Sequence, residues 1–100
     1  MLIKTSELTG VALDWAVAKA IGEYKPVAVP NYSTDWALAG PIIVREGIEL
    51  LCESLGFRWV ASPQKGPEWR GPTPLIAAMR CFVASRLGFE VDVPNELIGE

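Results

Sequence analysis

The pattern of apolar and polar positions is clearest in residues 71–88, where it predicts a helix with both ends marked. Thr73 can cap the helix with its hydroxyl, Pro74 fits the first helical position because no N–H is needed there, and Gly88 follows the last turn. At about 100° per residue, one side of this helix carries large apolar residues and another carries small ones. The large residues are Leu75, Ile76, Met79, Phe82, Val83 and Leu87, and the small ones are Ala77, Ala78, Cys81, Ala84 and Ser85. We expect a core against a sheet to cover the large side, and a backbone of this chain or of another copy to approach the small side.

Two arginines are the charged residues of this predicted helix. Arg86 lies near its C-terminal end, where a positive charge suits the helix dipole. Arg80 lies in the middle of the helix. If that side is covered, the guanidinium of Arg80 needs a carboxylate or an anionic ligand, so Arg80 is a candidate binding residue.

The N-terminal part of the chain predicts a strand followed by a helix. Residues 2–5 alternate apolar and polar positions as a short strand does, and Ser6 or Thr9 can open a helix over residues 11–21 that ends before Gly22. The expected core side of this helix consists of Leu13, Ala16, Val17, Ala20 and Ile21.

A second apolar stripe on the same helix consists of Val11, Trp15 and Ala18. One interpretation is that Trp15 folds down under a loop. The other is that the stripe belongs to a ligand pocket or a subunit interface, where tryptophan is over-represented. The residues alone leave both open.

Residues 24–41 have no sustained period and include three prolines, which predicts a long irregular loop. Within it, Ser33 or Thr34 can cap a helical turn over residues 35–38, and residues 41–47 predict a further short helix. Residues 48–52 and 57–61 predict a hairpin of two strands, although a helix over residues 41–55 also satisfies the spacing. Residues 62–71 read as a turn-rich connection, and residues 90–93 as a last strand.

This order of elements predicts a single α+β domain over residues 1–100. We expect a mixed or antiparallel sheet of about four strands with two main helices packed on it.

Composition narrows the function classes. The net charge of −3, with nine basic and twelve acidic residues well dispersed, removes the usual electrostatic support for nucleic-acid binding. Neither a secretion signal nor a membrane-spanning run is present in these 100 residues. Cys52 and Cys81 are expected to be two reduced, buried thiols.

The chain contains no histidine, which removes the commonest general base and the commonest zinc ligand. Asp14, Asp35 and Glu46 are the candidate carboxylates for other chemistry, but their spacing identifies no metal or glycosidase site. We therefore expect a protein that is not an enzyme, with no metal and no cofactor.

Two segments combine aromatic, hydroxyl and charged groups, and we expect them to meet at one ligand site. If the long loop folds over the start of the helix at residues 71–88, stacking faces and hydrogen-bonding groups converge there, which suits a nucleotide-like ligand. The same residues also have ordinary roles as helix caps and core. The candidate ligand-binding residues are Tyr32, Ser33, Thr34, Asp35, Trp36, Arg45, Trp69, Arg70, Thr73 and Arg80.

Long blocks of the sequence resemble one known family. They are KTSELTG with LDWAVAKA, STDWALAGPII with REGI, and GPTPLIAAMRCFVASRLG with VDVP. In these blocks, which lie within residues 4–94, the chain is similar to the NinX-like family of small bacteriophage proteins of unknown function. The resemblance implies a phage or prophage product in the host cytoplasm, and it implies no activity, cofactor or catalytic residue.

Because small accessory proteins of phages often act by binding, the expected function is the sequestration of a small anionic or nucleotide-derived ligand by a homo-oligomer. The alternative is a protein-binding module that inhibits or adapts a host factor through the stripe at Trp15. Neither nucleic acid nor a membrane is an expected partner.

Overall fold

The computed structural model of the chain describes residues 1–22, 28–53, 55 and 58–97. Its helices are α1 (Gly10–Ile21), α2 (Trp36–Glu46) and α3 (Pro74–Leu87), with short 3₁₀ helices η1 (Thr5–Glu7) and η3 (Asn95–Leu97). Its strands are β1 (Leu2–Lys4), β2 (Glu49–Glu53), β3 (Arg58–Ser62), β4 (Trp69–Gly71) and β5 (Glu90–Asp92). This composition confirms the α+β class.

Helix α3 has the ends that the sequence predicts. The Ile76 N–H donates to Thr73 Oγ1 at 3.1 Å, Pro74 is the first helical residue, and Gly88 follows the last one. A side chain that bonds the free N–H groups of the first turn stabilises a helix because these groups have no partner within it.

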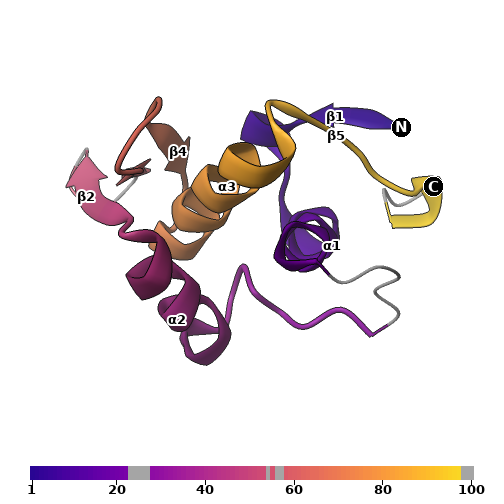
Figure 1. Ribbon diagram of the computed structural model, residues 1–100, viewed down its shortest axis with the longest axis horizontal. Coiled ribbons are helices and arrows are strands. Elements are labelled where there is room, and N and C mark those ends of the chain that lie inside the picture. The colour runs from indigo at the N-terminus through magenta and orange to yellow at the C-terminus, as the bar shows by residue number, and fades with distance from the viewer. Residues whose placement is uncertain (23–27, 54, 56–57, 98–100) are drawn as a thin grey trace.

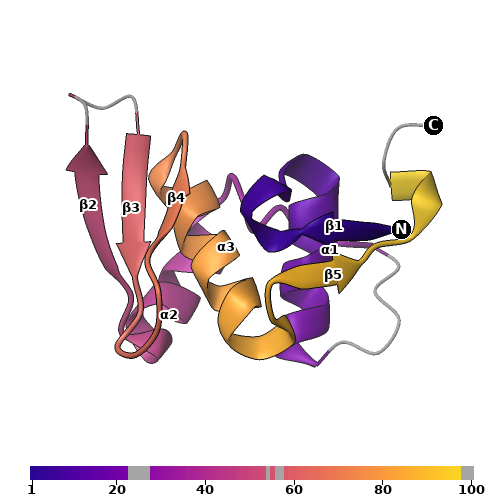
Figure 2. The ribbon, with the colours of Figure 1, turned by 90° about the horizontal axis from the view of Figure 1, so that it is seen from above.

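Helix α3 runs through the middle of the molecule (Figures 1 and 2), with α1, β1 and β5 on one side and β2, β3 and β4 on the other. Its small-residue side is approached closely by β4 of the same chain. A Cβ added to Gly71 would lie 2.7 Å from the backbone nitrogen of Ala77, so this approach requires glycine. The prediction that both sides are covered is confirmed for the buried residues Ala77, Ala78 and Cys81, whereas Ser85 is exposed.

The antiparallel pairing is as predicted, but a single sheet of about four strands with two main helices is wrong, because the described residues form five strands in two sheets and three α-helices. Strand β1 pairs with β5, and β3 lies between β2 and β4. Helix α3 has 14 residues and is therefore about 21 Å long, so it carries the chain from β4 to the opposite side of the molecule before β5 begins. Strand β4 was hidden in the turn-rich connection because three residues are too few to show a period.

The predicted hairpin is confirmed, and a helix continuing to residue 55 is wrong. Strands β2 and β3 pair from Glu49 with Ser62 to Glu53 with Arg58. Helix α2 ends at Gly47, so the apolar residues that follow it enter the strand. The predicted turn residues Ser54 and Gly56, and Phe57 at the start of the second strand, lie outside the described residues.

Two short helices were expected between residues 35 and 47, but the structure joins them into α2. Asp35 caps this helix, since its Oδ1 accepts the Ala37 N–H at 2.9 Å, so the predicted caps Ser33 and Thr34 are wrong. Pro41 lies inside the helix. A residue before proline usually avoids helical geometry because its Cβ meets the proline ring, but Gly40 has no Cβ.

One hydrophobic cluster joins the elements on both sides of α3. It includes Leu13, Ala16, Val17 and Ala20 of α1, as predicted, whereas Ile21 at the end of the helix is exposed. Among the described residues, no helix is long and apolar enough to span a membrane.

Both cysteines are free thiols, but they lie in different surroundings. Cys81 is buried, and burial together with the negative charge of Glu46 raises the pKa of its thiol to about 11. Cys52 lies on β2, which forms an edge of the three-stranded sheet, and it is exposed, so its predicted burial is wrong.

Candidate functional site

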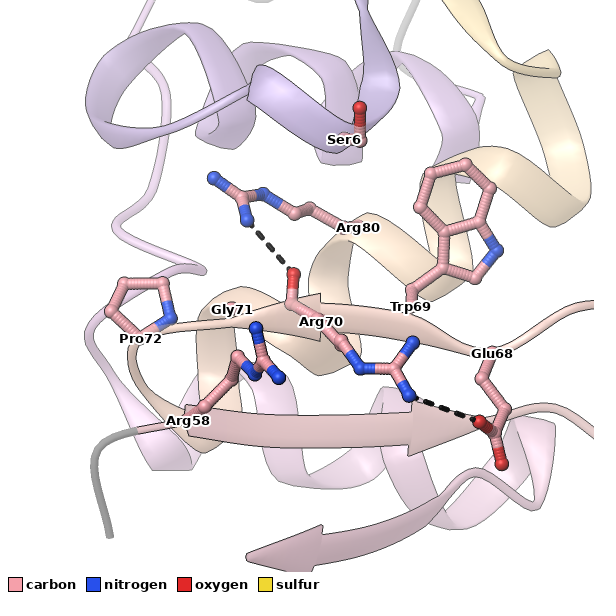
Figure 3. Close-up of a pocket in the computed structure, with 8 residues that line it drawn as sticks. All are labelled: Ser6, Arg58, Glu68, Trp69, Arg70, Gly71, Pro72 and Arg80. Carbon is pink, nitrogen blue, oxygen red and sulfur yellow. Dashed lines mark hydrogen bonds and ion pairs between the residues drawn. The ribbon is translucent and has the colours of Figure 1, made fainter. Parts of the chain in front are cut away.

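Most of the predicted site residues line separate hollows on the surface, which we treat in turn. The first, which we call the arginine pocket, has a volume of about 510 Å³ (Figure 3). It is lined by Ser6, Arg58, Glu68, Trp69, Arg70, Gly71, Pro72 and Arg80. Strand β4 supplies one wall, η1 supplies Ser6, β3 supplies Arg58 and α3 supplies Arg80.

Arg80 is held in place by two backbone carbonyls. Its Nε donates to the Leu8 oxygen and its Nη1 to the Arg70 oxygen, each at 2.8 Å. The described residues contain no carboxylate paired with it, so of the two predicted partners the carboxylate is not observed and the anionic ligand stays a prediction. Partial burial lowers the pKa of Arg80 by desolvation, but an arginine remains charged at neutral pH. Its remaining N–H donors have no partner in the described part of the chain.

Arg58 and Arg70 share one carboxylate on the face of the three-stranded sheet. The Nε atoms of both lie 3.4 Å from Oε1 of Glu53, and Nη2 of Arg70 lies 3.6 Å from Oε1 of Glu68. All of these ion pairs are partly exposed, so each contributes little stability and can be exchanged for a ligand at low cost. Together with Arg80, three guanidinium groups thus stand against two carboxylates, and the pocket has an excess of positive charge.

The backbone of β4 adds a donor to the arginine pocket. Arg70 lies opposite Val60 of β3, and its carbonyl points away from β3 to Arg80 (Figure 3). In an antiparallel pair, the N–H and the C=O of one residue face the same side. The Arg70 N–H therefore also faces the pocket side of β4, beside the guanidinium of Arg80.

A second hollow adjoins the first, and we call it the aromatic pocket. It has a volume of about 510 Å³ and is lined by Lys4, Ser6, Trp69, Phe89 and Glu90. Ser6 and Trp69 line both hollows. The ring centroids of Trp69 and Phe89 lie 5.5 Å apart with the ring planes at 53°, and Phe89 is 63% exposed.

Four of the other predicted residues lie at a third, smaller hollow of about 230 Å³, the cap hollow, which is lined by Ser33, Thr34, Trp36, Thr73, Pro74 and Leu75. Tyr32, Asp35 and Arg45 line none of the three hollows. The long loop does therefore meet the start of α3, but at Thr73 and not at Trp69 or Arg70. The expected convergence of all these residues on one site is not observed.

Most polar groups around the cap hollow are bonded within the fold. The backbone N–H of Ser33 donates to Oδ1 of the buried Asp14 at 2.8 Å. Asp35 and Thr73 cap α2 and α3, and Tyr32 is buried in the hydrophobic cluster. These are the ordinary capping and core roles that the sequence offered as the alternative to ligand binding.

Arg45 lies away from all three hollows. Its Nε is 3.3 Å from Oε2 of Glu46, and the same oxygen accepts from Nη2 of Arg86 at 2.8 Å. Glu46 and Asp14 thus have internal partners. No group of three acidic or cysteine residues in the described part of the chain is placed to hold a metal ion.

The stripe on α1 is mostly covered. Ala18 is fully buried, and Trp15 packs partly buried against the hydrophobic cluster, with Nζ of Lys19 5.1 Å from its ring centroid. Val11 is exposed. The stripe therefore offers one side chain, rather than three, to a partner.

Sequence reasoning missed several pocket residues. Lys4, Ser6, Arg58, Phe89 and Glu90 come from β1, η1, β3 and the segment after α3. No spacing connects them, because strand pairing and helix packing bring them together. The one available local signal was Phe89, a large apolar residue directly after a helix end.

Comparison with known proteins adds the family. No curated protein matches the chain. A family model described as Bacteriophage P22, NinX matches residues 4–86, which is most of the sequence and includes the three arginines of the arginine pocket, Arg58, Arg70 and Arg80. The chain therefore belongs to the bacteriophage NinX family.

Proposed function

We propose that this protein binds a small anionic, nucleotide-derived ligand in the arginine pocket and acts by withdrawing that ligand from solution. One observation carries the proposal. Arg80 is fixed by two carbonyls, has no carboxylate partner among the described residues, and opens on the same pocket as Arg58 and Arg70. Binding alone suffices for this function, and no catalytic group is required.

The arginine pocket suits such a ligand in its charge, in its size and in the fixed position of Arg80. Guanidinium groups present planar donors that match phosphate and carboxylate oxygens. Because Arg80 is already fixed, binding loses little of its conformational entropy. The volume of about 510 Å³ lies within the range of small-molecule sites, roughly 300–1,000 Å³.

The test is titration calorimetry with pyrophosphate and ADP, together with thermal unfolding in their presence. A ligand that binds the folded state raises the melting temperature as its concentration exceeds Kd. The double variant Arg58→Gln with Arg70→Gln removes two partly exposed cations and is expected to weaken binding by about 100-fold, at about tenfold for each charge-assisted contact. Arg45→Gln is the matched control, because Arg45 lies outside the pocket.

The proposal fails if millimolar pyrophosphate and ADP leave the melting temperature unchanged. It also fails if the double variant binds as tightly as the natural sequence, or if Arg45→Gln weakens binding equally. Arg80→Gln is measured alongside for both affinity and melting temperature, since its carbonyl bonds also connect α3 to β4 and to Leu8.

We propose in addition that the protein works as a homo-oligomer. The support is the set of exposed large apolar side chains around α2 and β2, namely Val44, Leu51 and Leu55. Strand β2 is also an edge of its sheet, and an open edge is a ready surface for pairing. Light scattering after size exclusion tests this, and a monomer for the natural sequence, unchanged in Leu51→Lys, overturns it.

The alternative function, a protein-binding module that acts through α1, has less support. Of the three stripe residues, Val11 is exposed. The test is a pull-down from a host lysate. A host protein that is recovered with the natural sequence and with the arginine variants, but lost with Val11→Lys, would favour this alternative.

A further inference from the structure

We infer that the aromatic pocket selects a guanine base, so that the ligand is a guanine nucleotide with its phosphates in the arginine pocket. This inference rests on the proposed function, because it assumes that the arginine pocket holds the anionic end. It adds a second binding site and a base preference that the arginines themselves do not provide.

The aromatic pocket contains a largely exposed ring. Phe89 is 63% exposed directly after α3, beside the partly buried Trp69. At 5.5 Å and 53°, the two rings leave no room for a third ring between them. A base therefore lies over the open side of Phe89, with Trp69 as the adjoining wall. Stacking on an aromatic side chain suits every base, so it explains base binding but not base choice.

The preference for one base comes from Lys4 and Glu90. These residues are direct cross-strand partners in the β1–β5 pair, and both line the aromatic pocket. Cross-strand partners have Cβ atoms about 5 Å apart. Neither side chain has a hydrogen bond or ion pair within the described residues, so the ammonium and the carboxylate both remain available to a ligand.

This pair matches the edge of guanine better than that of the other bases. Guanine carries the N1–H and N2 amino donors next to the O6 and N7 acceptors. A carboxylate accepts both donors, and a lysine donates to O6 or N7. Adenine places the N1 acceptor beside its amino group, so a carboxylate there gains one hydrogen bond and meets a lone pair. Uracil presents two carbonyls and a single donor, which leaves most of the carboxylate unpaired.

The two pockets adjoin, and we infer that one ligand occupies both. Trp69 and Ser6 line each of them. Ser6 and Arg80 line the arginine pocket together (Figure 3), and Ser6 also lines the aromatic pocket. A nucleotide placed this way sets its phosphates against Arg80, Arg70 and the Arg70 N–H.

The test compares GDP, ADP and pyrophosphate by titration calorimetry at one ionic strength and without divalent cations. GDP is expected to bind about tenfold more tightly than ADP, which corresponds to one well-made base contact, and ADP more tightly than pyrophosphate. Glu90→Gln should reduce the ratio of the GDP and ADP affinities to about one and leave pyrophosphate unchanged. Phe89→Leu should weaken both nucleotides alike and again spare pyrophosphate.

The exposure of Glu90 and Phe89 makes both variants compatible with folding. Glu49→Gln is the matched control, since Glu49 is an exposed glutamate on β2. Equal affinities for GDP and ADP, or a preference for GDP that survives Glu90→Gln, overturns the inference. Pyrophosphate binding without any gain from the nucleoside also overturns it and leaves the proposed function standing. If none of the three ligands binds, the proposed function itself fails and the inference fails with it.

Discussion

The cap hollow and the arginine pocket both lie beside α3, yet they use their polar groups differently. At the cap hollow and directly behind its lining, Thr73, Asp35 and Asp14 each accept a backbone N–H of this chain. In the arginine pocket, Arg80 uses two of its donors on carbonyls and keeps the rest open, and the Arg70 N–H faces the same space.

This difference distinguishes polar groups that stabilise the fold from polar groups that can bind a ligand. A polar group that is already bonded in the fold must lose that bond before it can bind a ligand, and it stabilises the fold instead. A fixed group with open donors can bind without such a loss. Substitutions around the cap hollow should therefore change stability and leave binding alone, whereas substitutions in the arginine pocket should change binding.

The largest expected effect is that of Gly71→Ala, at a wall of the arginine pocket. The new Cβ would lie 2.7 Å from the Ala77 nitrogen and 3.0 Å from Cγ2 of Ile76, so β4 must move away from α3. We expect a loss of about 3 kcal/mol in the free energy of unfolding, together with weaker anion binding.

Gly10→Ala is the control for Gly71→Ala. Gly10 has a φ of 57° but no atom within 4 Å of an added Cβ, so the cost there is backbone strain of about 1 kcal/mol. Urea denaturation measures both variants. Equal losses would mean that β4 moves away from α3 at little cost, and that the close approach does not require glycine.

Asp14→Ala tests the cap hollow. The buried carboxylate accepts the Ser33 N–H at 2.8 Å, and its removal leaves that donor unpaired in the interior. We expect a loss of about 2 kcal/mol in the free energy of unfolding, with pyrophosphate affinity unchanged. A variant that folds well but no longer binds pyrophosphate would show that the two regions are coupled.

Thr73→Ala should have a smaller effect of the same kind. Its hydroxyl caps α3 by accepting the Ile76 N–H at 3.1 Å, and loss of such a cap costs about 1 kcal/mol. Thermal unfolding measures the loss, and Thr73→Ser, which retains the hydroxyl, should restore most of it. If Thr73→Ala also weakened pyrophosphate binding and Thr73→Ser restored it, Thr73 would belong to a binding site.

Local signals in the sequence predicted the features that depend on neighbouring residues. The two ends of α3 follow from Thr73, Pro74 and Gly88, and the β2–β3 hairpin from two apolar runs of suitable length. The continuity of α2 depends on a more specific local detail, the glycine before Pro41. The general rule that a helix ends before proline predicts a break there, because it assumes a residue with a Cβ at that position.

The arginine pocket could not be predicted as a whole because its residues meet only through tertiary packing. Arg70 and Arg80 were identified as candidates from residue type and position. Their neighbours Ser6 and Arg58 come from η1 and β3, and β4 has only three residues. The cap residues entered the predicted site because serine, threonine and aspartate are used both for capping and for binding, and residue type alone does not separate the two uses.

The smallest expected effect, and the one most specific to the arginine pocket, is that of Glu53→Gln. Glu53 holds Arg58 and Arg70 at 3.4 Å through one carboxylate oxygen. Because these pairs are partly exposed, their loss should leave the melting temperature nearly unchanged. It should also free two guanidinium groups for a ligand and raise the affinity for pyrophosphate about threefold, since it removes a competing negative charge. Glu49→Gln on the same strand should change neither quantity. If Glu53→Gln weakened pyrophosphate binding instead, Glu53 would be needed to position the arginines, and the pocket would depend on its ion pairs just as the cap hollow depends on its hydrogen bonds.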